Sequence, residues 1–534
     1  MNPIVTQGRR LSASLALLAA LLVIGGCGSG ESPASGETAG AGGGGASSAD
    51  AEVLRIPFLA DMSVPDPDVF YDIEGNSVIL SAYEGLLRYE PDSTEIVGNL
   101  AEDYEVSEDR RTYTFTLRDG VKFHSGAPMD ARAVKASLER RLDVDQAPAY
   151  MLKDVARIST PDDSTVVIRL KQVVNPFLHY LASSWGPKII GPAAIEENAD
   201  DDFGQEWMQT HTDGTGPYEL TGFDRGRQYT MTRNAEYWGD KANFETVLLK
   251  IVPDIGSQRL QISNGDLDVI THSFPASELA SLEESSDLQV LRQDSFLRLL
   301  LYVNTHKAPF DDPAVREGLR STIDIEQLVS EGYAGTATAS TGPYPPEILE
   351  NQPELPYAPD PAQAKAAADS AATKEIVLGY SADESGVLRR VAELLQARLA
   401  EAGYQLTLRE VQLPQVYGYI DDLESAPDLL LQTNTPDAAH PDTWARIVFE
   451  SGGGLNFLGF SDRQVDTKLE QALTAPEARA ADLYREVGQR VIDSNSIFFL
   501  GDLRDVMVAR EDLTGIRHTP AYPWTLDLAS LERK

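Results

Sequence analysis

A carboxylate, an amide, an imidazole and an indole follow one another closely in one stretch of the chain. Asn434, Asp437, His440 and Trp444 come directly after an apolar segment, PDLLLQ, which is typical of a buried strand ending near Gln432. In open α/β sheets, ligands bind in the crevice beyond the carboxyl ends of the strands. We therefore expect the stretch 434–444 to line a ligand site.

Covalent catalysis and metal binding find little support in the same sequence. The chain contains no HExxH, GxSxG, Walker A or Ser-x-x-Lys sequence, which are the usual marks of several hydrolase and nucleotide-binding classes. The sequence does not exclude a catalytic pair of carboxylates in so acidic a chain, but no surrounding motif identifies one. His440 has no neighbouring histidine or cysteine, and a lone imidazole is weak evidence for a metal. We expect a protein that is not an enzyme and binds no metal or other cofactor.

Cys27 is the only cysteine of the chain and ends an N-terminal export segment. Arg9 and Arg10 precede an apolar run at 11–24, and two glycines lead into Cys27. This pattern is typical of a secretory signal, and the run is too short for a comfortable membrane span. Residues 24–27 resemble a bacterial lipobox, which implies cleavage before Cys27 and a lipid on its sulfur.

We accordingly expect a signal peptide at 1–26 and a flexible, lipid-anchored linker at 27–50, since the linker is rich in glycine and lacks large apolar residues. The protein would be extracytoplasmic and held on the cell membrane. An ordinary signal peptide with an incidental cysteine is the alternative, and both the general and the twin-arginine export routes stay open.

Composition limits the partners of the remaining body, which holds about 480 residues, enough for two or three domains. The formal net charge of −38, from 83 acidic and 45 basic residues, disfavours binding to nucleic acid and to anionic lipid. A single cysteine allows no disulfide within the chain. We expect a monomer whose partner is a small solute.

Apolar periodicity predicts a mixed α and β body. Strands are expected at 53–58, 112–117, 165–170, 229–233, 246–252, 297–304 and 427–432, with a hairpin from 112–117 into 121–123 through Asp119-Gly120. Helices are expected at 76–89 and 131–142, the second capped by Asp130. The clearest βαβ unit has strands at 374–380 and 405–411 and a helix at 386–402 that Gly403 ends.

The stretch 82–142, which begins AYEGLLRYEPD and continues through TYTFTLRDGVKFHSGAPMDARAVKASL, closely resembles the family 5 solute-binding proteins of ABC importers. These proteins bind peptides, nickel or oligosaccharides. Further segments in the family's order are GTGPY at 214–218, RNAEYW at 233–238, GDLDV at 265–269, YVNT at 302–305 and FDDPAVR at 310–316. The chain is identified as a member of this family, and most residues of these motifs are expected to be structural.

The resemblance implies an α/β fold of the two-lobed periplasmic-binding-protein type, class II, in the three-domain variant. Lobe I would comprise 51–83, 213–294 and 498–534, an extra domain 84–212, and lobe II 295–497. Strands at 296–304 and 497–500 would cross between the lobes as a hinge. Capture of a peptide-like solute and its delivery to permease and ATPase subunits are implied, while an oligosaccharide, a metal chelate or a secreted enzyme are the alternatives.

The resemblance also implies a role for Asp437. In peptide-binding relatives an aspartate followed four residues later by proline, and then by an aromatic, holds the ligand's ammonium group. Asp437, with Pro441 and Trp444 after it, matches that pattern. A charge-assisted hydrogen bond would form, and an uncharged ligand would leave the carboxylate buried and unpaired. A role as a solvated loop or N-cap residue stays open.

The match with peptide binders is incomplete. Asn434 stands where they carry tryptophan, and the loop 381–385 lacks the arginine that dipeptide binders use for the ligand's carboxylate. A short peptide held at both ends is therefore disfavoured, whereas longer peptides and other cationic solutes stay open. Trp185 is expected either to stack on the ligand from the extra domain or to lie in a core.

Overall fold

The structure, a computed structural model, describes residues 52–271, 274–383 and 385–534. The predicted signal peptide at 1–26 and the whole predicted linker at 27–50, Cys27 included, therefore lie outside the described residues. Those that are described belong to one compact unit, Ser47–Lys534. Within them, no helix combines the length and the apolar character that crossing a membrane requires.

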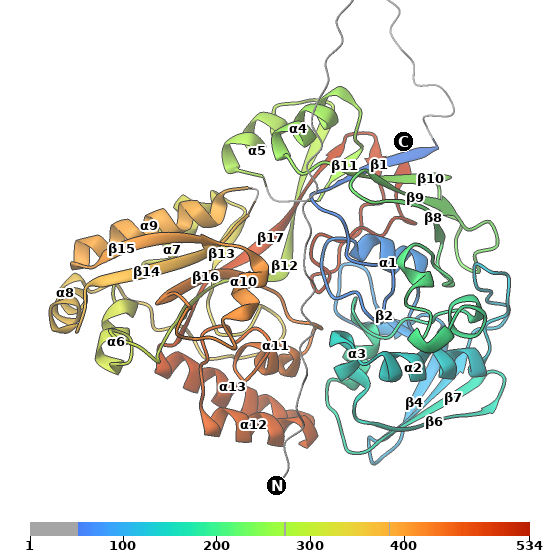
Figure 1. Cartoon of the computed structure of the whole chain (residues 1–534), viewed down its shortest axis with the longest axis horizontal. Helices are drawn as coiled ribbons and strands as arrows, with labels where there is room; N and C mark the ends of the chain where they lie inside the picture. Colours follow the sequence, from blue (N-terminus) through green and yellow to red (C-terminus); the bar gives the residue numbers. More distant parts are fainter. Residues whose placement is uncertain (1–51, 272–273, 384) are drawn as a thin grey trace, which may run out of the picture. The chain divides into compact units, whose positions relative to one another are not determined.

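Two four-stranded sheets are built from the N-terminal half (Figure 1). In the first, β1 (Val53–Phe58) pairs in parallel with β10 (Thr246–Ile251), followed by β9 (Gln228–Arg233) and β8 (Tyr218–Asp224). In the second, the order is β4 (Ala101–Val106), β5 (Thr112–Leu117), β7 (Thr165–Leu170) and β6 (Val155–Asp162). The strands expected in these segments are confirmed.

Helix α2 (Ala131–Val144) begins as predicted, because the Asp130 carboxylate accepts from two backbone N–H groups of the first turn at 2.9 Å. The expected hairpin into 121–123 is wrong. The N–H of Met129 donates to the carbonyl of Val121, so this stretch pairs with 127–129, and β5 forms its hairpin with β4 instead.

The helix expected at 76–89 is shorter than predicted. Helix α1 (Asn76–Ala82) ends where the chain becomes extended at Tyr83. The carbonyl of Glu84 then accepts from the N–H of Ile189 at 2.8 Å, and β2 (Leu87–Tyr89) pairs with β3 (Ile96–Gly98). Tertiary pairing thus overrides a helical pattern of apolar residues, as it often does for short segments.

The third sheet has seven strands in the order β11 (Val269–Ile270), β17 (Ile497–Arg510), β12 (Leu288–Val303), β16 (Leu429–Asn434), β14 (Glu375–Ser381) and β15 (Gln405–Val411), with β13 (Ala337–Ala339) on β17. The predicted βαβ unit is confirmed, since β14 and β15 are parallel and α9 (Val387–Ala402) joins them. Gly403 ends α9 with φ +111°, a conformation that favours glycine.

Both faces of β12 are buried in its second half, which explains its continuous apolar sequence. Leu299 and Leu301 pack with α7 (Ile325–Tyr333) and α9 on one face. Leu300 and Tyr302 pack with α11 (Pro441–Val448) and α13 (Glu477–Ser494) on the other (Figure 1). The remaining elements are α3 (Phe177–Ala182), α4 (Ile255–Asn264), α5 (Ala276–Glu283), α6 (Pro313–Arg320), α8 (Pro361–Ser370), α10 (Leu413–Gly418), α12 (Arg463–Thr474), β18 (Leu513–Thr514), β19 (Glu532–Arg533) and four short turns of helix. The turns are Ala147–Leu152, Ala193–Glu197, Asp200–Asp202 and Trp207–Gln209.

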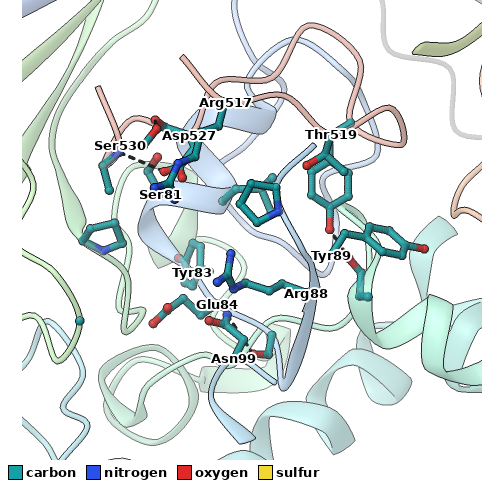
Figure 2. A pocket seen from close by; sticks show the side chains of 18 of the residues that line it. Ser81, Tyr83, Glu84, Arg88, Tyr89, Asn99, Arg517, Thr519, Asp527 and Ser530 are labelled. Carbon is teal, nitrogen blue, oxygen red and sulfur yellow. Dashed lines mark hydrogen bonds between the residues drawn. The ribbon is translucent and has the colours of Figure 1, made fainter. Parts of the chain in front are cut away.

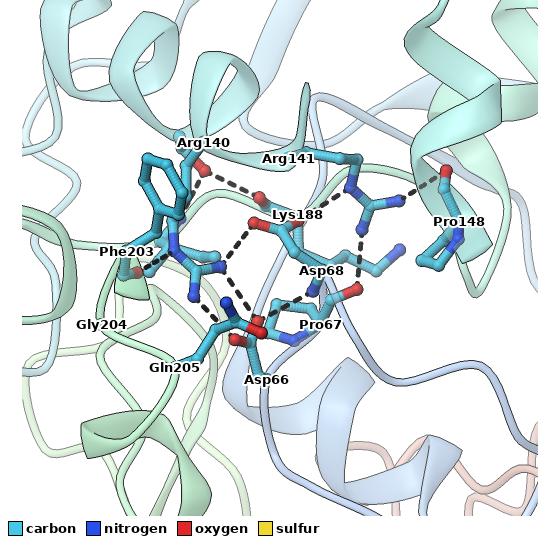
Figure 3. A network of polar contacts seen from close by, with 12 residues as sticks. Asp66, Pro67, Asp68, Arg140, Arg141, Pro148, Lys188, Phe203, Gly204 and Gln205 are labelled. Carbon is cyan, nitrogen blue, oxygen red and sulfur yellow. Dashed lines mark hydrogen bonds and ion pairs between the residues drawn. The ribbon is translucent and has the colours of Figure 1, made fainter. Parts of the chain in front are cut away.

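A buried cluster of two aspartates and two arginines joins α2 to the segment that follows β1 (Figure 3). The Arg140 guanidinium donates to both oxygens of Asp66, at 3.0 and 2.6 Å, and to Asp68 at 2.6 Å. Arg141 donates from Nε to the other oxygen of Asp68 at 2.8 Å. All four residues are almost fully buried. Each charge therefore has an opposite charge in direct contact, as burial requires.

The same cluster fixes the neighbouring loop. The Arg141 Nη1 and Nη2 atoms donate to the carbonyls of Trp185 and Gly186 at 2.7 and 3.1 Å. The buried Lys188 amine donates to the carbonyl of Ser183 at 2.7 Å. The cluster thereby sets the positions of the 183–188 loop and of the segment that leads to Tyr71.

Replacing Asp68 by asparagine should destabilise the protein strongly. The change keeps the shape but leaves two buried guanidinium groups short of one negative charge, which typically costs about 3–5 kcal/mol. Urea unfolding followed by circular dichroism measures the free energy of unfolding. Asp109→Asn is the matched control, because Asp109 pairs with Arg111 on the exposed surface and should change stability little. Equal effects of the two substitutions would contradict this account of the cluster.

Candidate functional site

Asp437 lies in the turn between β16 and α11, at the carboxyl end of β16 as the sequence predicts. The strand continues to Asn434, two residues beyond its predicted end. His440 caps α11, because its Nδ1 accepts from the N–H of Asp442 at 3.1 Å. Only 5% of Asp437 is exposed, so it is neither a solvated loop residue nor the cap of the helix.

The Asp437 carboxylate receives two tyrosine hydroxyls from distant parts of the chain. Tyr71 donates to Oδ2 at 2.6 Å, and Tyr150 donates to the same oxygen. The Ser183 hydroxyl donates to the Asp437 carbonyl at 2.5 Å. Among the described residues, no hydrogen bond reaches the second carboxylate oxygen, Oδ1. Burial raises the pKa of Asp437 above its ordinary 3.8, and the two hydroxyls oppose that rise.

Trp185 approaches this carboxylate through Tyr71. The indole N–H donates to the carbonyl of Asp72 at 2.8 Å, and the ring meets Tyr71 edge-on with centroids 5.6 Å apart. Trp185 is 5% exposed, whereas Tyr71 and Tyr417 of α10 are 40% and 47% exposed. Trp185 therefore holds Tyr71 in place, and the exposed aromatic surface beside Asp437 belongs to the tyrosines.

Asn434 and Trp444 lie deeper in the fold. The Asn434 side chain donates to the Tyr302 hydroxyl at 2.9 Å, and both residues are buried. Trp444 has no exposed surface, and its indole N–H donates to the carbonyl of Pro343 at 2.9 Å. Our expectation that Trp444 contacts the solute is at odds with this position, because the core around α11 encloses the ring and leaves it to support the loop from beneath.

His440 faces a second histidine, His179, which the sequence did not identify as a neighbour. The rings of His440 and His179 of α3 are 5.2 Å apart, and His179 Nδ1 is 3.1 Å from the Tyr89 hydroxyl. Burial lowers the pKa of each histidine to about 3, so both are neutral near pH 7. The part of the chain that the structure describes holds no group of three or more His, Cys, Asp or Glu side chains arranged for a metal ion.

Three of the sequence motifs meet at one buried carboxylate, Glu84 of the YEGL segment. It accepts from the Thr215 hydroxyl of GTGPY at 2.7 Å. It also accepts from the Tyr237 hydroxyl and the Trp238 indole of RNAEYW at 3.0 and 2.9 Å. Burial raises the pKa of Glu84 despite these bonds. The motifs therefore act together in holding the fold, in line with the structural role expected for them.

Comparison with known proteins matches residues 95–456 to the bacterial extracellular solute-binding proteins, family 5 (middle region). The probable D,D-dipeptide-binding periplasmic protein DdpA of Escherichia coli is 28% identical over 494 residues, covering 90% of this chain and 94% of that protein. The glutathione-binding protein GsiB of Salmonella typhimurium is 28% identical over 480 residues, covering 88% and 92%.

Solved structures show the same fold. The periplasmic binding protein DppA from Helicobacter pylori, in complex with the peptide STSA, has a TM-score of 0.78 at 21% identity and covers 90% of this chain and 98% of its own. NikZ from Campylobacter jejuni, in complex with Ni(L-His), has a TM-score of 0.78 at 20% identity, covering 90% and 100%. The expected periplasmic-binding-protein fold is confirmed.

Proposed function

Because the chain belongs to the bacterial extracellular solute-binding proteins, family 5, we propose that it captures a peptide-like solute for an ABC importer. The observation that carries this proposal is the Asp437 carboxylate, buried where three segments meet, with one oxygen that receives no bond from the described residues. Relatives named for dipeptide and glutathione binding, and a neighbour that holds a peptide, support a peptide as the solute.

The geometry suits an ammonium group. Tyr71 and Tyr150 hold Asp437 through Oδ2, which leaves Oδ1 to accept from the solute. A bond between two charged groups in a site with little water is strong, and it selects against solutes that lack the charge. The tyrosine hydroxyls keep the carboxylate in one orientation, so little ordering is needed when the solute enters.

The loop after β14 contains no arginine that could bind the solute's carboxylate. Ser385 donates to Asp383 at 2.5 Å, and the N–H of Val387 donates to the same carboxylate at 3.0 Å, so this loop starts α9. We therefore favour longer peptides over dipeptides. A metal chelate is the second candidate, since His179 and His440 place two neutral imidazoles side by side, and a neutral imidazole is a good metal ligand.

The remaining parts of the proposal follow from this role. The protein is extracytoplasmic, and we propose that it acts as a monomer, tethered by a lipid on Cys27 and docking onto the permease of an importer whose ATPase drives transport. Lobe closure would couple solute binding to docking. Binding of this kind makes and breaks no covalent bond, so we propose that the protein is no enzyme and releases its solute intact.

Replacing Asp437 by asparagine should remove the preference for a free amino terminus. We expect tetra-alanine to bind the native protein, and Asp437→Asn to weaken that binding by about 1.5–3 kcal/mol, the scale of a hydrogen bond between charged groups. N-acetylated tetra-alanine, which has no ammonium group, should bind both proteins equally weakly. Calorimetry measures the affinities, and mass spectrometry should recover the peptide uncleaved.

The matched control for this experiment is Asp421→Asn, which removes one negative charge from an exposed position in the same part of the chain. It should leave the affinity for tetra-alanine unchanged. If Asp437→Asn also left it unchanged, Asp437 would not hold the ammonium group. A response to Ni²⁺ with histidine, and none to either peptide, would favour the chelate.

Affinity for the free peptide should fall as the pH drops. An ammonium group pairs only with the ionised carboxylate, and burial raises the pKa of Asp437. Binding is therefore complete well above that raised pKa and is lost as the pH falls through it, at a higher pH than for an exposed aspartate. Titrations between about pH 7.5 and 4.5 test this, a range in which His179 and His440 stay neutral. An unchanged affinity throughout would contradict it.

Replacing Cys27 by serine should release the protein from membranes. A diacylated cysteine binds a bilayer by burying its acyl chains, and serine cannot carry the thioether. Fractionation of the expressing cells should move the variant from the membrane pellet to the soluble extract, without a change in affinity for tetra-alanine. A wild-type protein found in the soluble extract would show that Cys27 carries no anchor.

A further inference from the structure

We propose that a second pocket, separate from Asp437, binds a small organic anion with one carboxylate and a flat apolar body. This pocket has a volume of about 460 Å³, within the usual range for sites of small ligands. All its lining residues come from 80–99, 118, 182–188, 217, 237–240 and 517–530. No residue of the predicted lobe II lines it, and among the described residues one hydrogen bond joins its lining to the Asp437 loop: the N–H of Ala439 donates to the Tyr89 hydroxyl at 2.9 Å.

The pocket lacks the acidic excess of the chain as a whole. Acidic residues outnumber basic ones 83 to 45 overall, yet as many arginines as carboxylates line this space. The arginines are Arg88, Arg118 and Arg517, and the carboxylates are Glu84, Asp240 and Asp527. Lys188 also lines the space, but burial lowers its pKa to about 7. Glu84 already receives three donors, which leaves less of its charge to neutralise the arginines.

Two of the guanidinium groups that line the pocket are available to bind a ligand. Arg88 of β2 and Arg517 of the C-terminal segment are exposed, and neither guanidinium group forms a hydrogen bond or ion pair with the residues that the structure describes. They come from separate stretches of chain and line the same space (Figure 2). Arginine donates in a planar fork that matches a carboxylate, so these two side chains are suited to receive one.

A third arginine is held in place beside them. The Nε of Arg118 donates to the carbonyl of Asn99 at 2.5 Å, and its guanidinium lies 4.9 Å from the centre of the Trp238 ring. Trp238 is in turn bonded to Glu84. These bonds hold Arg118 and Trp238 in place, so one positive charge and one aromatic ring line the pocket in fixed positions.

The rest of the lining selects among anions. Tyr89, Trp238 and Tyr522 provide aromatic surface, which suits a flat apolar body. Asp240 and Asp527 are exposed and negative, so a second charge on the ligand would be repelled. A monocarboxylate therefore fits better than a phosphate or a dicarboxylate.

Calorimetric titration of the purified chain with phenylacetate tests the proposal. We expect saturable binding that the double variant Arg88→Gln/Arg517→Gln weakens at least tenfold, the change that corresponds to about 1.4 kcal/mol. Phenylacetamide, which has the same ring without the charge, should bind weakly to both proteins. Arg157→Gln is the matched control, because Arg157 is also an exposed strand arginine and does not line the pocket. No saturable binding, or equal affinity in the double variant, would overturn the proposal.

The Asp437→Asn variant separates this site from the proposed peptide site. It should bind phenylacetate as the native protein does, and the double arginine variant should bind tetra-alanine normally. Loss of phenylacetate binding in Asp437→Asn would place the anion in the other site and overturn the inference. Loss of tetra-alanine binding in Asp437→Asn alone bears only on the proposed function.

Discussion

The position of Tyr71, which donates to Asp437, depends on four charged side chains that are buried together. Asp66, Asp68, Arg140 and Arg141 have almost no exposed surface, and each carboxylate is in contact with a guanidinium group. Such a cluster is tolerated only when its geometry leaves no charge unpaired, and the fixed fork of arginine permits few arrangements. The chain on either side, including the segment that ends at Tyr71, is therefore held where the cluster puts it.

Another buried carboxylate, that of Glu84, is stabilised in a different way from those of Asp66 and Asp68. Glu84 has no charged partner within bonding distance and is satisfied by three neutral donors from GTGPY and RNAEYW. Burial therefore raises its pKa. From the sequence we predicted a structural role for these motifs. In the structure, GTGPY and RNAEYW perform that role together by donating to Glu84. That they converge on one side chain could not be predicted, because Thr215 and Trp238 lie 131 and 154 residues from Glu84.

Local signals predicted what local interactions determine. The βαβ unit around α9 and the stop at Gly403 follow from apolar spacing and from backbone conformation. The helix expected through Leu87–Tyr89 was wrong because pairing with β3 decides that segment. For the site, the position of Asp437 followed from the strand before it, but its donors did not. Tyr71 and Tyr150 are 366 and 287 residues away, and no pattern around either residue marks it as a partner.

The paired strands β12 and β17 overlap the two stretches predicted to form a hinge between the lobes. Their register shifts between Asp294 and Arg298, so the ladder is interrupted there, as it is at a β-bulge, where a strand bends. Immediately beyond, Arg298 donates to Asp502 at 2.6 Å, and both are buried. A buried ion pair resists separation, so we expect bending to concentrate at 294–298. The predicted hinge at 296–304 overlaps this stretch, and a rotation there would carry Asp437 toward or away from Tyr71.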